Sequence, residues 1–490
     1  MSIAFWSSEL SRKIVSRIVV ECDLVLKTPA HFGNGNRDDV LTDMPLLVDS
    51  LDEKTPLLTG ASIAGALRSY LRECENKTLS TLLFGSAKSD DNAGDTGEQS
   101  PLIIEDSLGK NFGFEIRDGV TIEPKSRTAK DDHLFNTQFW QAGTIFPLRF
   151  ELLIRETDNA QKLKQALAIT LQALSQGNIT LGSRKRRGFG NVAIKEFLIK
   201  EYDLRTPTGL CDWIKKGSEK LCDTYKQDLK TALAYPASFL DNQHIFIMKM
   251  ACSLDGSLII RSVGDNHQAA DIQHLHSQRV NEITEKLENK PVISGTSLAG
   301  VLRARATKII NTLTQNNQAK TTKIIQEMFG YSEEKRKSEG KASRLIVSEA
   351  VLEKVVTNLV QNRVSVDRFT GGARDTALFN EQPAFGADDS NIVFDIKLIN
   401  PEKYEIGLLL LLLKDLWTGD LVIGGQSSIG RGRLKGKEAC LKCANKDVKE
   451  EWLIKEVNNK LIFEKGTSQE LETYVGQHLL KHLQLISEVA

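Results

Sequence analysis

The chain has 490 residues, of which 40% are hydrophobic and 26% charged, and its 64 basic and 64 acidic side chains give a net charge of zero. This length predicts two or three globular domains, and the balanced charge excludes a global field that would draw the chain to nucleic acid or to a membrane. The longest apolar run, residues 408–413, is too short to cross a bilayer. Seven scattered cysteines argue against a disulfide framework and predict a cytoplasmic protein.

The first predicted strand, residues 18–26, is followed by a polar loop that carries His31, Asn34 and four aspartates, namely Asp38, Asp39, Asp43 and Asp49. A carboxylate in such a loop can hold a divalent cation or take part in acid–base chemistry. An acidic turn on a solvated face is the alternative. The residues alone leave both interpretations open.

A short strand and a helix follow in the stretch PLLTGASIAGALRSYLR, residues 56–72. We expect the helix to begin at Ser62, with that serine as its cap, behind a Thr59-Gly60 turn. A helix start of this kind presents free backbone N–H groups and a partial positive charge, which suits an anion. Arg68 lies about two turns further on. A plain cap beside a surface arginine would need no ligand.

An apolar helix is predicted at residues 161–175, and the glycine-rich loop GSRKRRGFG follows at residues 182–190. Glycine lets a loop approach another backbone closely, and successive cations neutralise phosphate. Phe189 could stack on a base. A solvated basic turn is again the alternative. The four cations of this loop are Arg184, Lys185, Arg186 and Arg187.

Three stretches occur twice in the same order, which indicates an internal duplication. Residues 291–307 read PVISGTSLAGVLRARAT, so that Gly295, Ser297 and Arg303 correspond to Gly60, Ser62 and Arg68. Residues 364–380 correspond to residues 120–136, and the loop GGQSSIGRG at residues 424–432 corresponds to residues 182–190. The offsets of 235, 244 and 242 residues are nearly constant. Two copies with the same glycine, serine and arginine favour phosphate binding over a plain helix cap.

Each copy has an α+β plan of strand–helix–strand repeated, which is the pattern of the ferredoxin-like fold. The sheet of that fold is a common platform for single-stranded RNA. We divide the chain into a first domain (residues 1–202), a helical linker (203–243), a second domain (244–446) and a C-terminal helical appendage (447–490). One CxxC pair, Cys440 and Cys443, has no partner pair nearby, so no structural zinc is expected.

These features together resemble the RAMP superfamily, the RNA-binding backbone subunits of CRISPR interference complexes. The G-x-S-[IL]-x-G-x-[LM]-R stretch matches at residues 60–68 and 295–303, and the glycine-rich loop matches at residues 182–190 and 424–432. The D-x-P-[IL] segment of type III backbone subunits matches at Asp43-Met-Pro45-Leu46. The "thumb" segment V-x-I-D-R-x-T-G matches at residues 364–371, whereas residues 120–125 depart from it. Two such units in one chain resemble a fused double-RAMP subunit of a III-D-like complex.

The resemblance implies two tandem ferredoxin-like (RRM-like) domains, each with a thumb-like insertion. It implies CRISPR RNA and target RNA as ligands, and other RAMP subunits and the large subunit of the complex as partners. It also implies a metal-dependent endoribonuclease that cleaves target RNA, with Asp43 as the main catalytic and metal-binding residue and Mg²⁺ or another divalent cation bound loosely. Asp38 and Asp39 compete with Asp43. Asp271 is the nearest equivalent in the second copy, although its spacing to the following helix differs.

The resemblance further implies a set of RNA contacts in both copies. Two alternatives stay open, a guide-RNA scaffold without catalysis and a guide-processing RNase. Such RNases use a histidine-centred acid–base site, for which the candidates are His31, His267, His274 and His276. The expected RNA-binding residues are His31, Asn34, Gly60, Ser62, Arg68, Lys125, Arg127, Arg184, Lys185, Arg186, Arg187, Phe189, Gly295, Ser297, Arg303, Arg368, Phe369, Ser427, Ser428 and Arg431.

Overall fold

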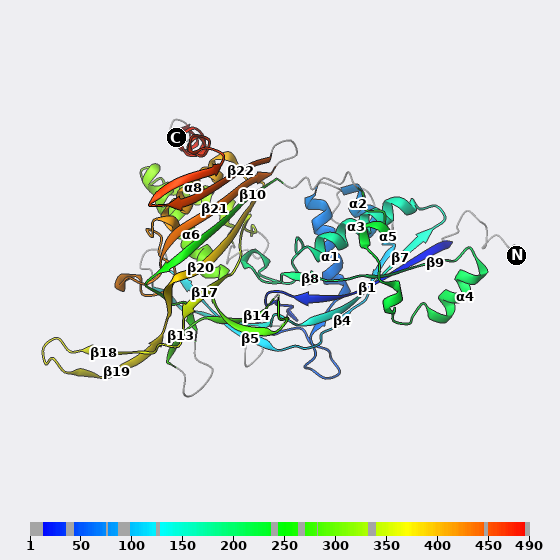
Figure 1. Cartoon of the computed structure of the whole chain (residues 1–490), viewed down its shortest axis with the longest axis horizontal. Coiled ribbons are helices and arrows are strands. Elements are labelled where there is room, and N and C mark those ends of the chain that lie inside the picture. Colours follow the sequence, from blue (N-terminus) through cyan, green and yellow to red (C-terminus); the bar gives the residue numbers. More distant parts are fainter. Residues whose placement is uncertain are drawn as a thin grey trace.

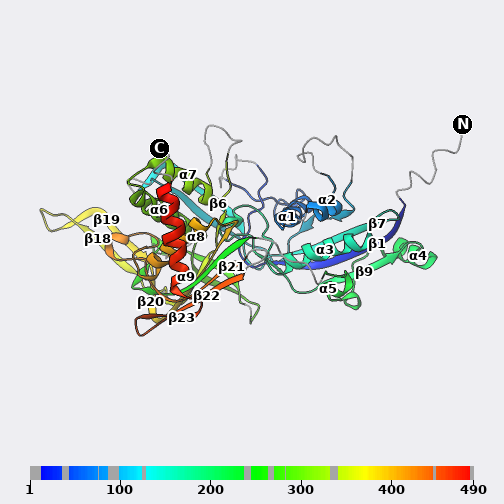
Figure 2. The same ribbon diagram turned by 90° about the horizontal axis from the view of Figure 1, so that it is seen from above.

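The computed structural model shows two antiparallel sheets with helices packed on one face of each, side by side along the long axis (Figure 1 and Figure 2). It describes residues 13–35, 44–74, 77–86, 99–123, 128–236, 244–262, 270–281, 283–331, 340–444 and 449–485. Each sheet has its own hydrophobic core, so the chain contains two units, one built on each sheet.

The sheet of the first unit has the strand order β3-β7-β1-β8, with β9 also paired to β1. All of these pairs are antiparallel. Ile18, Val20 and Leu24 alternate along β1 and point into the core, as the period of a strand requires. The strands are β1 (Ile14–Leu26), β3 (Leu102–Ile104), β7 (Ile145–Arg155), β8 (Val192–Ile194) and β9 (Leu198–Asp203).

The sheet of the second unit repeats this order around β10 and then continues beyond it. β10 lies between β20 and β21, while β16 and β17 pair with β20, and β22 and β23 extend the sheet past β21. The sheet has ten strands. They are β10 (Ile245–Asp255), β11 (Ser257–Leu258), β14 (His276–Val280), β15 (Leu287–Ile293), β16 (Leu345–Val347), β17 (Ala350–Val356), β20 (Ala384–Ile399), β21 (Arg433–Ala444), β22 (Lys449–Val457) and β23 (Lys460–Lys465).

Three helices cover the inner face of each sheet. In the first unit they are α1 (Gly60–Glu73), α2 (Lys77–Phe84) and α3 (Ala160–Ser175), and in the second α6 (Gly295–Leu313), α7 (Gln318–Phe329) and α8 (Lys403–Trp417). The apolar run at residues 408–413 lies inside α8, which is buried in the second core. In the described part of the chain, no helix has the length and apolar character needed to span a membrane.

Each unit also carries a β-hairpin, β5 (Phe114–Ile122) with β6 (Ala129–Trp140) and β18 (Gln361–Val366) with β19 (Ala373–Gln382). Val120 pairs with Leu134 in the first hairpin, and Val364 pairs with Leu378 in the second. These pairs differ by the same offset of 244 residues, and both ladders shift register just after them. The two hairpins therefore have one register, as a duplication requires.

The segment predicted as a helical linker contains α4 (Pro207–Lys216), the short helix η4 (Asp223–Tyr225) and α5 (Leu229–Ala232). It packs on the outer face of the first sheet, where Val19, Tyr202 and Leu221 form a small second core. The guanidinium of Arg17 lies 4.6 Å above the ring of Trp213. This face is therefore covered and cannot serve as an open platform for RNA.

The C-terminal region was predicted to be helical, and its first part is not. β22 and β23 add two strands to the second sheet. On β22, the buried Trp452 and Ile454 alternate with half-buried positions, so one face of the strand packs on the core. Helix begins only at Ser468, with α9 (Ser468–Thr473), a π-helical turn η6 (Tyr474–Leu480) and α10 (Lys481–Leu485) packed toward α8.

Short strands complete the described chain. Cys440 and Cys443 lie in β21, and positions three apart on a strand point to opposite faces. The short strands are β2 (Leu57–Leu58), β4 (Ser107–Leu108), β11 (Ser257–Leu258), β12 (Arg261–Ser262), β13 (Ile272–His274), β14 (His276–Val280) and β15 (Leu287–Ile293).

Candidate nucleic-acid interface

The repeated helices α1 and α6 begin two residues earlier than predicted. Their caps are Thr59 and Ser294, whose hydroxyl oxygens accept from the backbone N–H of Ser62 and Ser297 at 3.3 and 3.2 Å. The cap hydroxyls also donate to the Ser62 and Ser297 hydroxyls at 2.9 and 2.8 Å. Ser62 and Ser297 therefore lie in the first turn of each helix and are not its caps. The cap is the hydroxyl residue that precedes Gly60 or Gly295.

Gly60, the first residue of α1, is required by close packing. A Cβ atom built there would overlap the carbonyl group of Ile104. At Gly295 of α6 it would overlap the carbonyls of Val347 and Arg187. The repeat of this glycine is therefore explained by contacts within the protein.

The repeated arginines Arg68 and Arg303 also have protein partners. Arg68 donates from Nη2 to the carbonyl of Gly85 at 2.8 Å, and Arg303 donates from Nη1 to the carbonyl of Gly330 at 3.1 Å. Both glycines follow the next helix, α2 or α7, so each arginine satisfies carbonyls at a helix end. The repeat of this arginine is therefore explained by contacts within the protein, and its role in phosphate binding stays a prediction.

A second repeated glycine of these helices has no such explanation. Gly65 of α1 and Gly300 of α6 are exposed in the middle of a helix, and a Cβ atom at either would meet nothing within 4 Å. Glycine costs a helix interior about 1 kcal/mol relative to alanine. Open space around a costly glycine in both units is consistent with close approach by a ligand backbone.

The two glycine-rich loops have the same backbone. Gly182 and Gly424 have φ of +85° and +84°, and Gly188 and Gly430 have φ of +86° and +87°. Between them lie short helical turns, η3 (Lys185–Arg187) and η5 (Ser427–Ile429). The duplication therefore preserves the loop conformation while its charge changes, since Ser427 and Ser428 are exposed where the first loop is basic.

Two predicted RNA contacts in these loops are buried. Phe189 is 3% exposed and stacks on Phe139, with ring centroids 4.3 Å apart, so its ring has no free face for a base. Arg431, also 3% exposed, forms an ion pair with Glu381 at 3.1 Å and donates to the Gln361 side chain at 2.8 Å. Residue type alone does not reveal this burial, and neither side chain is open to a ligand in this structure.

The first loop packs against the start of α6 in the second unit. Arg187 donates to the carbonyl of Leu345 at 3.3 Å, and a Cβ at Gly188 would lie 2.9 Å from the Cα of Ser348. Burial, followed by the charges of Arg303 and Arg186, lowers the pKa of Arg187. Positive charge from both units is thus concentrated at one helix start, an arrangement that favours an anion.

A groove of about 410 Å³ in the first unit brings predicted residues together. It is lined by the first turns of α1, including Ser62 and Gly65, by the loop at Lys185 and by His31. Lys185 is exposed, and burial lowers the pKa of the neighbouring Arg184. The groove combines a helix N-terminus, hydroxyl groups and cations, which are the groups that bind phosphate.

His31 is held in one orientation beside this groove. Its Nδ1 lies 2.7 Å from the carbonyl oxygen of Gln138, so Nδ1 carries the proton and donates. Burial, together with the positive charge of Arg184, lowers the pKa of His31. The imidazole is therefore neutral at pH 7, with Nε2 as an acceptor next to Gly33.

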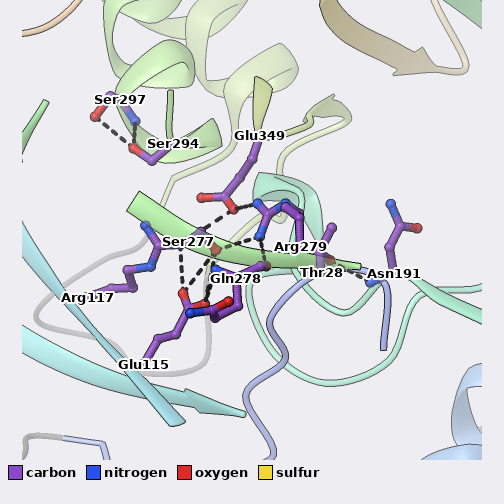
Figure 3. Close-up of polar contacts among 10 residues, drawn as sticks. All are labelled: Thr28, Glu115, Arg117, Asn191, Ser277, Gln278, Arg279, Ser294, Ser297 and Glu349. Atoms are coloured by element: carbon purple, nitrogen blue, oxygen red, sulfur yellow. Dashed lines mark hydrogen bonds and ion pairs between the residues drawn. The ribbon is translucent and has the colours of Figure 1, made fainter. Parts of the chain in front are cut away.

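A buried ionic cluster joins the two units at the first hairpin (Figure 3). The Glu115 carboxylate accepts from the Ser277 hydroxyl at 3.0 Å and from the backbone N–H of Gln278 at 2.8 Å. Arg117 donates to Glu115 at 2.9 Å. The cluster continues through Glu349, only 1% of whose side chain is exposed, to Arg279 at 2.5 Å. None of these residues belongs to a repeated motif, so no sequence signal marked them.

Several predicted residues lie outside the described part of the chain, namely Asp38, Asp39, Asp43, Lys125, Arg127 and His267. Asn34 is described beside the groove residue Gly33, and its backbone N–H donates to the carbonyl of Pro45 at 3.4 Å. Arg368 and Phe369 lie at the tip of the β18–β19 hairpin, where Phe369 is 96% exposed.

Asp271, the second catalytic candidate, is exposed and tied to the second hairpin. Its carboxylate accepts from the Asn380 backbone N–H at 3.0 Å, and its own N–H donates to the Asn380 side chain at 2.6 Å. Of its predicted neighbours, His274 is buried and His276 contacts the His274 carbonyl at 2.7 Å. Among the residues that the structure describes, no group of three His, Cys, Asp or Glu side chains could hold a metal ion.

The arrangement defines a class of protein, a tandem α+β chain in which each unit places a capped helix start near a glycine-rich loop. The family model of the RAMP superfamily matches the chain twice, over residues 23–193 and residues 264–435. The chain belongs to the RAMP superfamily, whose members are generally CRISPR-associated RNA-binding proteins. No match was found among curated proteins.

Proposed function

We propose that the chain is a double-RAMP backbone subunit of a type III, III-D-like CRISPR complex that binds CRISPR RNA and cleaves target RNA. Each unit would be ferredoxin-like, with the β5–β6 and β18–β19 hairpins as thumb-like insertions. The order β3-β7-β1-β8 supports this arrangement, because a β-α-β-β-α-β chain with antiparallel neighbours produces it. The partners expected are other RAMP subunits and the large subunit of the complex.

The observation that carries RNA binding is the groove between α1 and the first glycine-rich loop. Ser62, Gly65 and Lys185 line it together, although more than a hundred residues separate the last from the first two. The helix start attracts a phosphate, the glycine leaves room for the sugar–phosphate backbone, and the lysine neutralises charge. The outer face of the first sheet is covered by the linker, which supports the groove over the sheet face as the RNA path.

Salt dependence of RNA binding tests this groove. Fluorescence anisotropy with a labelled single-stranded RNA should give weaker binding for Lys185→Ala, with a slope of log K against log salt that is smaller by about 0.7. The control is Lys215→Ala on α4, an exposed lysine away from the groove. Equal slopes for the wild type and Lys185→Ala would remove the groove from the RNA path.

Cleavage of target RNA is proposed at Asp43, with Asp38, Asp39 and Asp271 as further candidates. An aspartate fits the chemistry, because its oxygens suit Mg²⁺ and can also orient an attacking 2′-hydroxyl. The ion, where bound, would stabilise charge that develops on the phosphate. In the assembled complex, Asp43→Asn should lose one cleavage product and keep its RNA affinity. If all products remain, the chain is a non-catalytic scaffold at that position.

His31 supports a second candidate, a guide-processing RNase. A neutral imidazole with Nδ1 anchored on Gln138 and Nε2 free to accept is suited to remove a proton from a 2′-hydroxyl. The test is His31→Gln with a labelled guide precursor and the isolated chain. Loss of processing with retained binding would favour this function, and absence of processing by the wild type would exclude it.

A further inference from the structure

The outer faces of the two sheets, opposite the helices that cover their inner faces, correspond residue by residue. The backbone N–H of Ser183 donates to the carbonyl of His31. The N–H of Gly425 donates in the same way to the carbonyl of Ile259, so β10 follows β1 at an offset of 259 − 31 = 228 residues. Outward-facing positions can therefore be matched across the duplication. The matched pairs are Val19 with Ile247, Glu21 with Lys249, Arg149 with Asp395 and Lys200 with Lys442.

The outer face of the first sheet is closed by the linker. Val19 is fully buried and Glu21 is only 8% exposed. The backbone N–H of Leu221 donates to the Glu21 carboxylate at 2.9 Å, and the guanidinium of Arg149 donates to the carbonyl of Gly217. The linker therefore satisfies both members of the central ion pair with its own backbone.

The matching face of the second sheet is open. The side chains of Lys249 and Lys442 are 56% and 52% exposed, and Val393 on the neighbouring β20 is 48% exposed. Lys249 lies 3.8 Å from Asp395, beyond hydrogen-bond distance. Lys442 pairs with Glu451 at 2.8 Å, and an ammonium group has three donors, so both lysines can bind a further acceptor. The chain continues from β21 into β22 and β23, and no described segment takes the place of the linker.

This open face mixes aliphatic and basic side chains. Ile245, Ile247 and Leu453 are half-buried on it. Because side chains alternate along a strand, the charged residues between buried positions lie on the same face. They are Lys249, Lys397, Lys435, Lys442 and Lys465 against Asp395, Glu438 and Glu451. An apolar area among excess lysines fits a protein surface that combines apolar side chains with carboxylates.

The central ion pair excludes the linker of a second copy as the occupant. Lys249 replaces Glu21, so the linker N–H that bonds the carboxylate would meet an ammonium group. Asp395 replaces Arg149, so the linker carbonyl would meet a carboxylate. Nucleic acid is also a poor match, because bases stack on aromatic side chains and the apolar residues named on this face are aliphatic.

We infer that the outer face of the second sheet binds a different protein chain. The segment that docks would place apolar side chains on Ile247 and Leu453 and carboxylates on Lys249 and Lys442. Such a contact removes the aliphatic side chains from water and gives the lysines charged acceptors. The cover on the first sheet is the template for the position of this segment, and the exchanged ion pair is the template for its charge. The inference rests on the two sheets alone and does not depend on RNA binding.

Zero-length crosslinking tests the inference on the assembly that the tagged full chain forms in its own cells. A carbodiimide joins a lysine only to a carboxylate in contact with it, and peptide mass spectrometry identifies both residues. Lys249 or Lys442 should be coupled to Asp or Glu residues of another protein. The double variant Lys249→Glu/Lys442→Glu should retain that protein about tenfold less well. The control Lys215→Glu/Lys216→Glu, at exposed lysines of α4, should retain it like the wild type.

A native thiol reports on the same contact without any substitution. Cys440 pairs with Lys249 across β10 and β21 and so lies on this face, whereas Cys211 is exposed on α4. Because thiol reactivity follows exposure, alkylation of Cys440 should be about tenfold slower in the assembly than in the isolated chain, and that of Cys211 should be unchanged. Coupling of the lysines only to carboxylates of this chain or of a second copy would overturn the inference. Ultraviolet crosslinking of RNA to this face, or equal alkylation of Cys440 in both samples, would overturn it as well.

Discussion

The two glycine-rich loops have the same backbone conformation, but one buried position carries an aromatic side chain in the first loop and a charged side chain in the second. Phe189 in the first loop and Arg431 in the second are equally buried, yet the phenylalanine stacks on Phe139 and the arginine pairs with Glu381. The duplication has preserved backbone and burial and has let the chemistry change. The comparison shows that a repeated position identifies a place in the fold, whereas its role depends on the partners that the rest of the chain supplies.

The largest expected effect is on the free energy of unfolding, in a comparison of alanine substitutions at the buried Phe189 and the exposed Phe369. Phe189→Ala should lower the free energy of unfolding by about 3–5 kcal/mol, because it empties a buried ring site. Phe369→Ala should change it by less than about 0.5 kcal/mol. Urea unfolding measures both. If Phe189→Ala were as stable as the wild type and bound RNA more weakly, the ring would be a base-stacking residue after all.

The second largest effect is expected for Arg431→Ala. It should lower the free energy of unfolding by about 3 kcal/mol, because it removes one partner of a buried ion pair. Glu381 is fully buried, and its remaining partners among the described residues would be Arg363, at 3.1 Å, and the amide of Gln426. The matched control is Arg433→Ala, two residues away and exposed. RNA affinity should stay constant in Arg431→Ala, and a loss of affinity at unchanged stability would restore the original prediction.

The duplication and the main elements could be predicted because they rest on local patterns. The helix predicted at residues 161–175 is α3, displaced by one residue at its start. The start of α1 was misplaced because both Thr59 and Ser62 are good caps, and only the contact of Gly60 with Ile104 selects the first. The burial of Phe189 depends on Phe139, fifty residues earlier. No local sequence pattern reveals a contact between residues so far apart. The same holds for the contacts of the Glu115–Glu349 cluster.

The third prediction concerns pH and the second unit, where His274 occupies a buried position near β15. Burial, followed by the charge of His276, lowers the pKa of His274 to about 3. Above pH 6.5 the imidazole is neutral in both the folded and the unfolded chain. Below pH 6.5 the unfolded chain binds a proton at His274 that the folded chain does not bind. Stability should therefore fall by about 2 kcal/mol from this residue between pH 6.5 and 5.

The variant His274→Gln checks this assignment, because glutamine does not titrate. Urea midpoints measured from pH 7.5 to pH 5 should decline less steeply in the variant than in the wild type, and the difference should grow as pH falls. Parallel curves for the two proteins would mean that the imidazole is protonated in the folded state.

The smallest effect tests the glycines that no protein contact explains. Gly65→Ala and Gly300→Ala should each raise stability by about 0.5–1 kcal/mol, because alanine is the better residue in an exposed helix interior. If a nucleic-acid backbone lies against α1, Gly65→Ala should at the same time weaken RNA binding, by about fivefold for 1 kcal/mol of steric cost. A variant that is more stable and binds more weakly separates function from folding, which no substitution at Gly60 or Arg68 can do. The second unit supplies the matching measurement: weaker binding in Gly300→Ala as well would place RNA on both helices, and weaker binding in Gly65→Ala alone would confine it to the basic groove of the first unit.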